Sequence, residues 1–195
     1  MRLVLASGSP RRSRLLADAG YTFDVVAPDV DETPSAGESP TSLVERLAMA
    51  KAVAVAQTHP DAAVLGADTV VVLDHRILGK PADAGHADDM LRDLSGRDHT
   101  VLTGWAIAHP AGCERNVTVT TVTFRALSAG EISDYVGTGE PMDKAGAYAI
   151  QGGAAGFATG IAGSYRNIVG LPVGDLYPIL LGLGICPRRP DGSTD

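Results

Sequence analysis

The residues best suited to chemistry at the start of the sequence form a small anion-binding pattern. Ser9, Arg11 and Arg12 follow a short apolar run and the turn Ser7-Gly8-Ser9. Ser9 and Pro10 are typical of a helix start, where free N–H groups and the positive end of the helix dipole attract anions. Arginines in the first turn oppose that dipole, so a bound anion would explain their placement. The alternative is an ordinary capped helix with solvated arginines.

Two carboxylates and a lysine could complete a phosphate site. Asp68 is the one charge in the apolar run 62–73, where an unpaired carboxylate is costly. We therefore expect Asp68 to bind a metal or act as a general base, or else to form a salt bridge with an N-terminal arginine. Glu32 lies in an acidic loop and, with Asp68, could hold Mg²⁺, which often takes one or two carboxylates plus substrate phosphates. Lys80, in Gly79-Lys80-Pro81, could bind phosphate or tune Asp68; the alternative is a surface lysine.

A further candidate is the segment 140–152, which mixes glycines, charges and the amide of Gln151. That density exceeds what a stable loop needs, which favours a segment that lines a ligand; an irregular surface hairpin is the alternative. A glutamine amide offers one acceptor and two donors. Gln151 could therefore bond a ligand edge that presents a donor beside an acceptor.

Composition narrows the classes of partner. The net charge of −7 disfavours a nucleic-acid polymer or an acidic membrane as the main partner, whereas a local basic cluster suits a small anion. No apolar run approaches the roughly 18 residues of a membrane span. Cys113 and Cys186 have no disulfide or metal spacing, and the N-terminus lacks a secretion signal. A reducing, cytoplasmic setting is expected.

The elements that must position these residues alternate in the N-terminal half. Hydrophobic periodicity and turn residues predict strands at 2–6, 21–27, 62–73, 77–78, 99–109 and 116–127. Helices are predicted at 10–19, 40–58, 83–94 and 172–183. A further short helix is predicted to begin at the capping box of Ser128 and Glu131. This order predicts an α/β fold with a mixed, extended sheet. We expect one domain over residues 1–186, of two lobes around a cleft, and a disordered tail at 187–195.

Taken together, these segments resemble the Maf family of nucleoside triphosphate pyrophosphatases. The match runs from Leu3 to about Leu181. Its motifs are Leu5-Ala6-Ser7-Gly8-Ser9-Pro10-Arg11-Arg12, Gly66-Ala67-Asp68-Thr69, Gly79-Lys80-Pro81, Ser95-Gly96 with His99 and Thr103-Gly104, Asp143-Lys144-Ala145-Gly146-Ala147-Tyr148, Ile150-Gln151-Gly152 and Val169-Gly170-Leu171-Pro172. The resemblance implies an elongated α/β fold with flanking helices and a central cleft, similar to inosine triphosphate pyrophosphatases. It also implies hydrolysis of a nucleoside triphosphate to the monophosphate and pyrophosphate with Mg²⁺ or a similar ion such as Mn²⁺.

The resemblance also implies roles for particular residues. Asp68 matches the proposed proton acceptor, and the phosphate and metal site is matched by Ser9, Arg11, Arg12, Glu32 and Lys80. Positions linked to base choice are matched by Arg12, Thr69 and Gln151. The branch that this chain resembles prefers dTTP and UTP, whereas a sister branch acting on 7-methyl-GTP has tryptophan after Ser-Pro, Asp-Gln for Asp68-Thr69 and Ser-Glu-Gly for Ile150-Gln151-Gly152. Modified pyrimidine nucleotides stay open as substrates, and so does the oligomeric state, monomer or homodimer.

The resulting hypothesis is metal-assisted hydrolysis. Glu32 and Asp68 hold the ion directly or through water, and Asp68 deprotonates the water that attacks the α-phosphorus. The charge building on the phosphate oxygens is offset by Arg11, Arg12 and Lys80, while Ser9 and the helix N-terminus hold the phosphate chain. The rival is a non-catalytic nucleotide sensor that restrains cell division, which would keep the arginines and glycines but would not need a buried aspartate beside a lysine.

Overall fold

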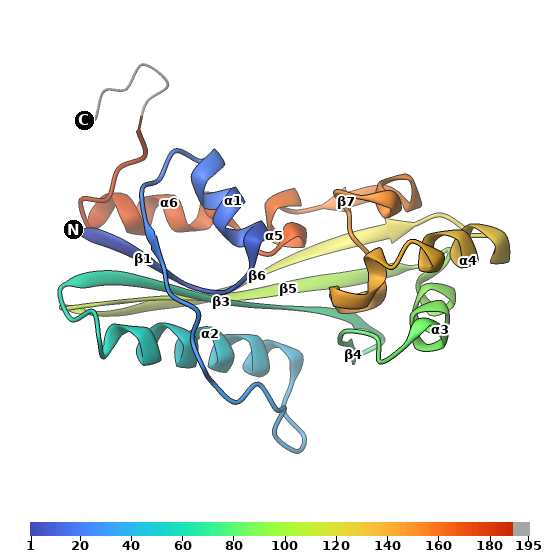
Figure 1. The fold of residues 1–195 in the computed structure, drawn as a ribbon, viewed down its shortest axis with the longest axis horizontal. Coiled ribbons are helices and arrows are strands. Elements are labelled where there is room, and N and C mark those ends of the chain that lie inside the picture. The colour runs from blue at the N-terminus through green and yellow to red at the C-terminus, as the bar shows by residue number, and fades with distance from the viewer. Residues whose placement is uncertain (189–195) are drawn as a thin grey trace. The chain divides into compact units, whose positions relative to one another are not determined.

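A mixed β-sheet is the framework of the protein (Figure 1). The computed structural model describes residues 1–188, and within them seven strands form one sheet in the order β2-β1-β3-β5-β6-β7, with β4 paired to β3. The strands are β1 (Arg2–Ala6), β2 (Asp24–Val25), β3 (Ala62–Leu73), β4 (Arg76–Leu78), β5 (Asp98–His109), β6 (Gly112–Phe124) and β7 (Ala158–Ala162). Pairing is parallel between β1 and both β2 and β3, and antiparallel between β3 and β4 and between β6 and β7. The predicted α/β class with a mixed sheet is confirmed.

The helices of the described chain are α1 (Pro10–Asp18), α2 (Pro40–Ala56), α3 (Ala84–Leu94), α4 (Ala129–Gly137), α5 (Tyr165–Val169) and α6 (Val173–Gly182). Short 3₁₀ turns lie at Glu140–Asp143, Ala145–Ala147 and Gly153–Phe157. No helix of the described residues is long and apolar enough to cross a membrane.

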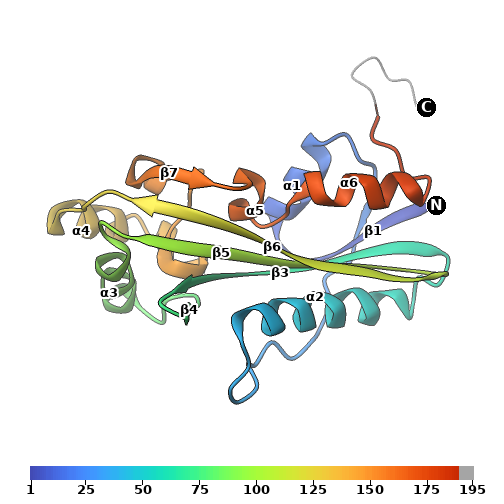
Figure 2. The ribbon, with the colours of Figure 1, turned by 180° about the vertical axis from the view of Figure 1, so that it is seen from behind.

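The chain divides into two compact units. The first contains Met1–Asp68, Thr103–Thr118 and the chain from Gly170 onward; the second contains Thr69–Leu102 and Val119–Val169. In the first unit, α2 covers one face of the sheet, and α1 and α6 cover the other (Figures 1 and 2). Two buried clusters build its core on α2. One joins α2 to β1 and β3 and the other joins α2 to β5: Val4, Ala6, Val55, Ala62 and Val64 in the first, and Ala48, Ala52, Ala106 and Ala108 in the second. The single domain of two lobes around a cleft stays a prediction.

Most predicted elements are confirmed, and two strand predictions need correction. The strand predicted at 21–27 has only two residues, Asp24–Val25, because the Tyr21 N–H bonds to the Leu16 carbonyl and completes the end of α1 instead. The second long strand begins four residues earlier than predicted and ends at Phe124. Neither β7 nor α5 was predicted. The tail prediction lies outside the described residues from position 189, while Arg188 donates its N–H to the Gly20 carbonyl at 2.8 Å.

Candidate active site

Close packing of α2 on the sheet brings a lysine onto Asp68. A Cβ on Gly66 would lie 2.3 Å from the Ala48 carbonyl oxygen, and one on Gly104 would lie 2.2 Å from another α2 carbonyl, so only glycine permits this approach. Lys51 on α2 is 6% exposed, and its Nζ donates to Asp68 Oδ1 at 2.7 Å. The expected neighbours of Asp68 were an N-terminal arginine as its salt-bridge partner and Lys80 as a tuning charge. The partner that the structure supplies is Lys51.

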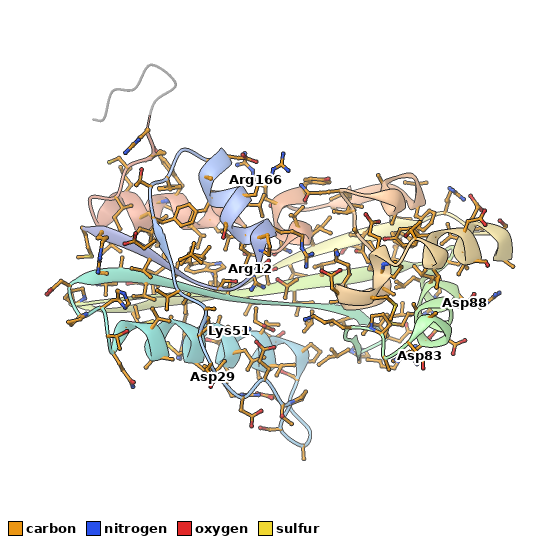
Figure 3. The ribbon with its side chains drawn as sticks, in the orientation of Figure 1. Arg12, Asp29, Lys51, Asp83, Asp88 and Arg166 are labelled. Carbon is orange, nitrogen blue, oxygen red and sulfur yellow. The ribbon has the colours of Figure 1, made fainter. Side chains whose placement is uncertain are left out.

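Lys51 also reaches the predicted metal-binding loop. Its Nζ lies 2.6 Å from Glu32 Oε1, so one buried ammonium bridges Glu32 and Asp68. Figure 3 shows Lys51 on α2 and Asp29 in the adjoining loop that leads to Glu32. Both predicted metal ligands therefore converge on one point of the first unit, although they lie far apart in the sequence.

The loop that carries Glu32 is anchored to α2 by Arg46. The Arg46 guanidinium binds Glu38 in a bidentate pair, at 2.7 Å from Nε to Oε1 and 2.8 Å from Nη2 to Oε2. Arg46 Nη2 also donates to the Thr33 carbonyl, one residue past Glu32, at 3.1 Å. The hydrogen bonds from Arg46 hold the pKa of Glu38 down at about 2. The loop is thus tied to α2 at two points that follow Glu32, at Thr33 and at Glu38.

The predicted turn and helix start at Ser9 and Pro10 are confirmed, but the capping role expected of the Ser9 side chain is not. Ser9 occupies the N-cap of α1, yet its side chain makes no capping hydrogen bond. The hydroxyl that organises the turn belongs to Ser7, which is 3% exposed and accepts from the Ser9 N–H at 3.2 Å. Ser7 Oγ also accepts from Arg12 Nη1 at 3.3 Å. Ser7 therefore links the turn to the guanidinium group of Arg12.

Arg12 is held at a second point. Its Nε donates to the Gly170 carbonyl at 2.9 Å, and Gly170 has a φ of +124°, a conformation that L side chains rarely adopt. Desolvation lowers the pKa of the Arg12 guanidinium, and the nearby charge of Arg11 lowers it further. The carboxylates of Asp68 and, to a smaller extent, Glu32 raise this pKa. Arg12 (labelled in Figure 3), Asp68 and Glu32 therefore share one electrostatic environment. Arg11 is half-buried beside them and contributes a further positive charge.

The donor set suits a hard divalent cation. Glu32 Oε1 and Asp68 Oδ1 both contact the same Lys51 nitrogen, so they are close enough for one ion to bind both, directly or through water. Within residues 1–188 no group of three or more His, Cys, Asp or Glu side chains could hold a metal. Two carboxylates complemented by substrate phosphates are the arrangement expected for Mg²⁺.

The remaining predicted residues belong to the second unit. Thr69 follows Asp68 on β3 and is half-buried, whereas Lys80 and Gln151 are exposed. The turn that carries Lys80 is tied to the glycine-rich segment, because the Gly79 carbonyl accepts the Gly146 N–H at 3.0 Å. A Cβ on Gly146 would lie 3.0 Å from Val71, and its φ is +69°, so glycine is required there. The predicted irregular segment is therefore a packed structure.

That segment rests on a buried aromatic cluster. His99 is 3% exposed, and its Nε2 lies 2.9 Å from the Tyr148 hydroxyl. Both rings stack edge to face with Phe124. Burial lowers the pKa of His99 to about 4, so the imidazole is neutral. These contacts give His99 a structural task that its place in the motif did not reveal.

Comparison with known proteins gives the family. Residues 2–183 match the Maf-like protein family, and the chain belongs to it. The dTTP/UTP pyrophosphatase of Pelotomaculum thermopropionicum is 53% identical over 93% of this chain and 96% of the relative. The dTTP/UTP pyrophosphatase of Myxococcus xanthus is 54% identical over 94% of this chain and 93% of the relative. The resemblance inferred from the motifs is confirmed.

Two of the solved structures that are similar to this chain share about a fifth of its sequence. One is a nucleoside-triphosphatase / dITP/XTP pyrophosphatase from Mycobacterium abscessus, with a TM-score of 0.42 and 20% identity over 65% of this chain and 76% of that one. The other is the Ham1 protein of Staphylococcus aureus, with a TM-score of 0.42 and 19% identity over 64% and 71%.

Proposed function

We propose that this protein is a nucleotide pyrophosphatase that hydrolyses dTTP and UTP to the monophosphate and pyrophosphate. The observation that carries the proposal is the convergence of Glu32 and Asp68 on the buried Lys51, in the same unit as the anion motif of Ser7 to Arg12. Relatives more than 50% identical over nearly their whole length carry the name dTTP/UTP pyrophosphatase. The two free cysteines, Cys113 and Cys186, accord with the reducing cytoplasm that we propose as its location.

Asp68 is the proposed proton acceptor. Because Lys51 donates to Oδ1, the other carboxylate oxygen, Oδ2, is left to accept a proton from water. That water forms a bond to the α-phosphorus, the bond from this phosphorus to the bridging oxygen breaks, and pyrophosphate leaves. Asp68 thus acts on the water, while Lys51 positions Asp68.

Glu32 and Asp68 are the residues that would hold a divalent ion, Mg²⁺ or Mn²⁺. When bound, such an ion neutralises charge on the phosphate oxygens and orients them. Arg46 contributes by fixing the loop that presents Glu32. The ammonium of Lys51 keeps the two carboxylates together before substrate arrives.

The phosphate chain is the proposed ligand of the α1 N-terminus. Free N–H groups at the start of α1 and the guanidinium groups of Arg11 and Arg12 would bind its oxygens. Ser7 and the Gly170 carbonyl fix the plane of the Arg12 guanidinium, which lowers the entropy lost when it binds. Ser9, at the same turn, is also proposed to hold the phosphate chain. For Lys80, Thr69 and Gln151, the roles in charge neutralisation and base choice remain proposals that rest on the family resemblance.

The test is to incubate the purified protein with UTP and Mg²⁺ and to separate the products. We expect UMP and pyrophosphate in equal amounts, with no UDP. Binding of UTP without any product would support the non-catalytic nucleotide sensor instead. UDP and phosphate as the first products would contradict attack at the α-phosphorus.

A further inference from the structure

Lys51, labelled on α2 in Figure 3, places its ammonium against both carboxylates that are proposed to hold the divalent ion. Its Nζ lies 2.6 Å from Glu32 Oε1 and 2.7 Å from Asp68 Oδ1. All three residues belong to the first unit. An ion that bound Glu32 Oε1 at the roughly 2.0–2.1 Å of Mg²⁺ would lie within about 5 Å of Nζ if the lysine did not move. Ammonium and ion would then compete for the same oxygens.

Two cations at that separation repel each other. The repulsion between a monovalent and a divalent cation about 5 Å apart corresponds to more than about tenfold in an equilibrium constant, even at the dielectric constant of water. The repulsion is stronger where water is excluded, and the side chain of Lys51 is only 8% exposed. A divalent ion is therefore bound firmly only when the ammonium gives up one of its two carboxylates.

The contact with Glu32 is the one that opens more readily. The side chain of Asp68 is 13% exposed, and its pair with Lys51 joins α2 to β3. The side chain of Glu32 is 60% exposed and lies in the loop that precedes α2. Water can solvate the Glu32 carboxylate when it leaves Lys51, whereas Asp68 would stay buried without its donor. Separation of Lys51 from Glu32 therefore costs less free energy than separation of Lys51 from Asp68.

We propose that Lys51 is a built-in competitor of the divalent ion, which reaches Glu32 only by displacing the ammonium. In this exchange Lys51 keeps its proton and its bond to Asp68, and Glu32 passes from Nζ to the ion. Substrate phosphates add ligands and negative charge, so the ion is held weakly without the phosphate chain and firmly with it. The choice of Glu32 and Asp68 as metal ligands rests on the proposed function, whereas the competition rests on the two distances.

The experiment titrates Mn²⁺ into the nucleotide-free protein and follows the unbound ion by its electron paramagnetic resonance signal, so no turnover is needed. Lys51→Met removes the competing charge and keeps an apolar stem. Its dissociation constant for Mn²⁺ should be lower than that of the wild type by about tenfold or more. Lys51→Arg keeps a permanent positive charge and should bind Mn²⁺ as weakly as the wild type.

Arg76→Met is the matched control, because it changes the net charge by the same amount at an exposed ion pair with Asp93 in the second unit. Its affinity for Mn²⁺ should equal that of the wild type. Addition of Glu32→Gln to Lys51→Met should abolish the gain, which would place the tighter site at Glu32. Equal Mn²⁺ affinity of wild type and Lys51→Met, or a gain that survives Glu32→Gln, would overturn the competition.

Urea unfolding gives a second readout, because Lys51→Met leaves Asp68 buried without its donor and should be less stable than the wild type. An ion that binds the native state stabilises it, so millimolar Mn²⁺ should raise the unfolding midpoint of Lys51→Met more than that of the wild type. If the variant is unfolded without the ion, Mn²⁺ should restore its native circular dichroism. A variant that Mn²⁺ neither stabilises more than the wild type nor refolds would contradict the proposal.

These measurements separate the competition from the proposed hydrolysis. If Lys51→Met binds Mn²⁺ more tightly but the wild type releases no UMP from UTP, the proposed function fails and the competition stands. If the wild type cleaves UTP and both proteins bind Mn²⁺ equally, the competition alone is refuted.

Discussion

Lys51 Nζ and Asp68 Oδ1 lie 2.7 Å apart, and both side chains are almost fully withdrawn from solvent. Each charge would be costly to bury alone, and each makes the other tolerable. The pair joins α2 to β3 at the point where Gly66 allows the helix to touch the strand. The site that we propose for catalysis is therefore also part of the packing between helix and sheet.

Removal of the Lys51 charge should destabilise the fold and abolish activity. Lys51→Met leaves Asp68 buried without its donor, which typically costs about 3–5 kcal/mol. Urea unfolding would measure this loss. The control is Arg76→Met, which removes the exposed ion pair with Asp93 and should cost at most about 1 kcal/mol. If Lys51→Met were as stable as Arg76→Met, the ion pair with Asp68 would not contribute to the free energy of unfolding.

Loss of Arg12, or of the Ser7 hydroxyl that holds it, should weaken triphosphate binding. Arg12→Ala removes a charge-assisted contact, typically worth about 1.5–3 kcal/mol, and should lower kcat/KM for UTP by about 10- to 150-fold. Arg11→Ala should also lower it. Ser7→Ala should cause a smaller loss, because the Gly170 carbonyl still holds Nε. Steady-state kinetics on UTP measure all three variants, and wild-type kcat/KM in both arginine variants would exclude the anion site.

Gln151 should govern the choice between bases. Gln151→Glu loses the two amide donors, so UTP and dTTP should lose more kcat/KM than CTP, GTP or 7-methyl-GTP. A site built to bond one edge discriminates by leaving its own groups unpaired. The measurement is kcat/KM for the five nucleotides in both proteins. Equal wild-type rates on all five, or the same ranking in the variant, would show that selectivity lies elsewhere.

His99 should make the stability of the fold depend on pH. Its pKa is about 4 in the folded state, because burial disfavours the cation, against about 6.5 when unfolded. The unfolded chain therefore binds the extra proton first, and stability should fall as pH decreases from about 6.5 towards 4, by roughly 3 kcal/mol in total. Urea unfolding between pH 7 and 5 in wild type and His99→Gln tests this. The variant should show a shallower decline, and parallel curves would contradict the assignment.

The sequence was most informative where one residue conflicts with its surroundings. Asp68 in an apolar strand and arginines in the first turn of α1 both marked the site. Lys51 was missed because a lysine within a helix usually lies in solvent. Its spacing from Leu47 and Val55 places it on the apolar face of α2, and that signal could have identified it.

Other features could not be predicted because they depend on tertiary contacts. The role of Ser7 follows from the path of Arg12 to Gly170, which lies 158 residues away in sequence. β7 contains only five residues, including a glycine, and forms because β6 offers an edge for antiparallel pairing. Local sequence propensities do not reveal either contact, because both depend on residues that are distant in the sequence.

Asp68→Asn offers the most direct test of the central claim. The amide keeps the shape of the side chain but cannot accept the proton from water, and Lys51 keeps Glu32 as a partner. Pyrophosphate released from UTP and Mg²⁺ should be measured in wild type and variant, with circular dichroism to verify folding. We predict that the wild type forms UMP and pyrophosphate, and that the folded variant loses about 10²–10⁴-fold or more in kcat, as expected for removal of a general base. A folded Asp68→Asn variant with near-wild-type turnover would contradict the account.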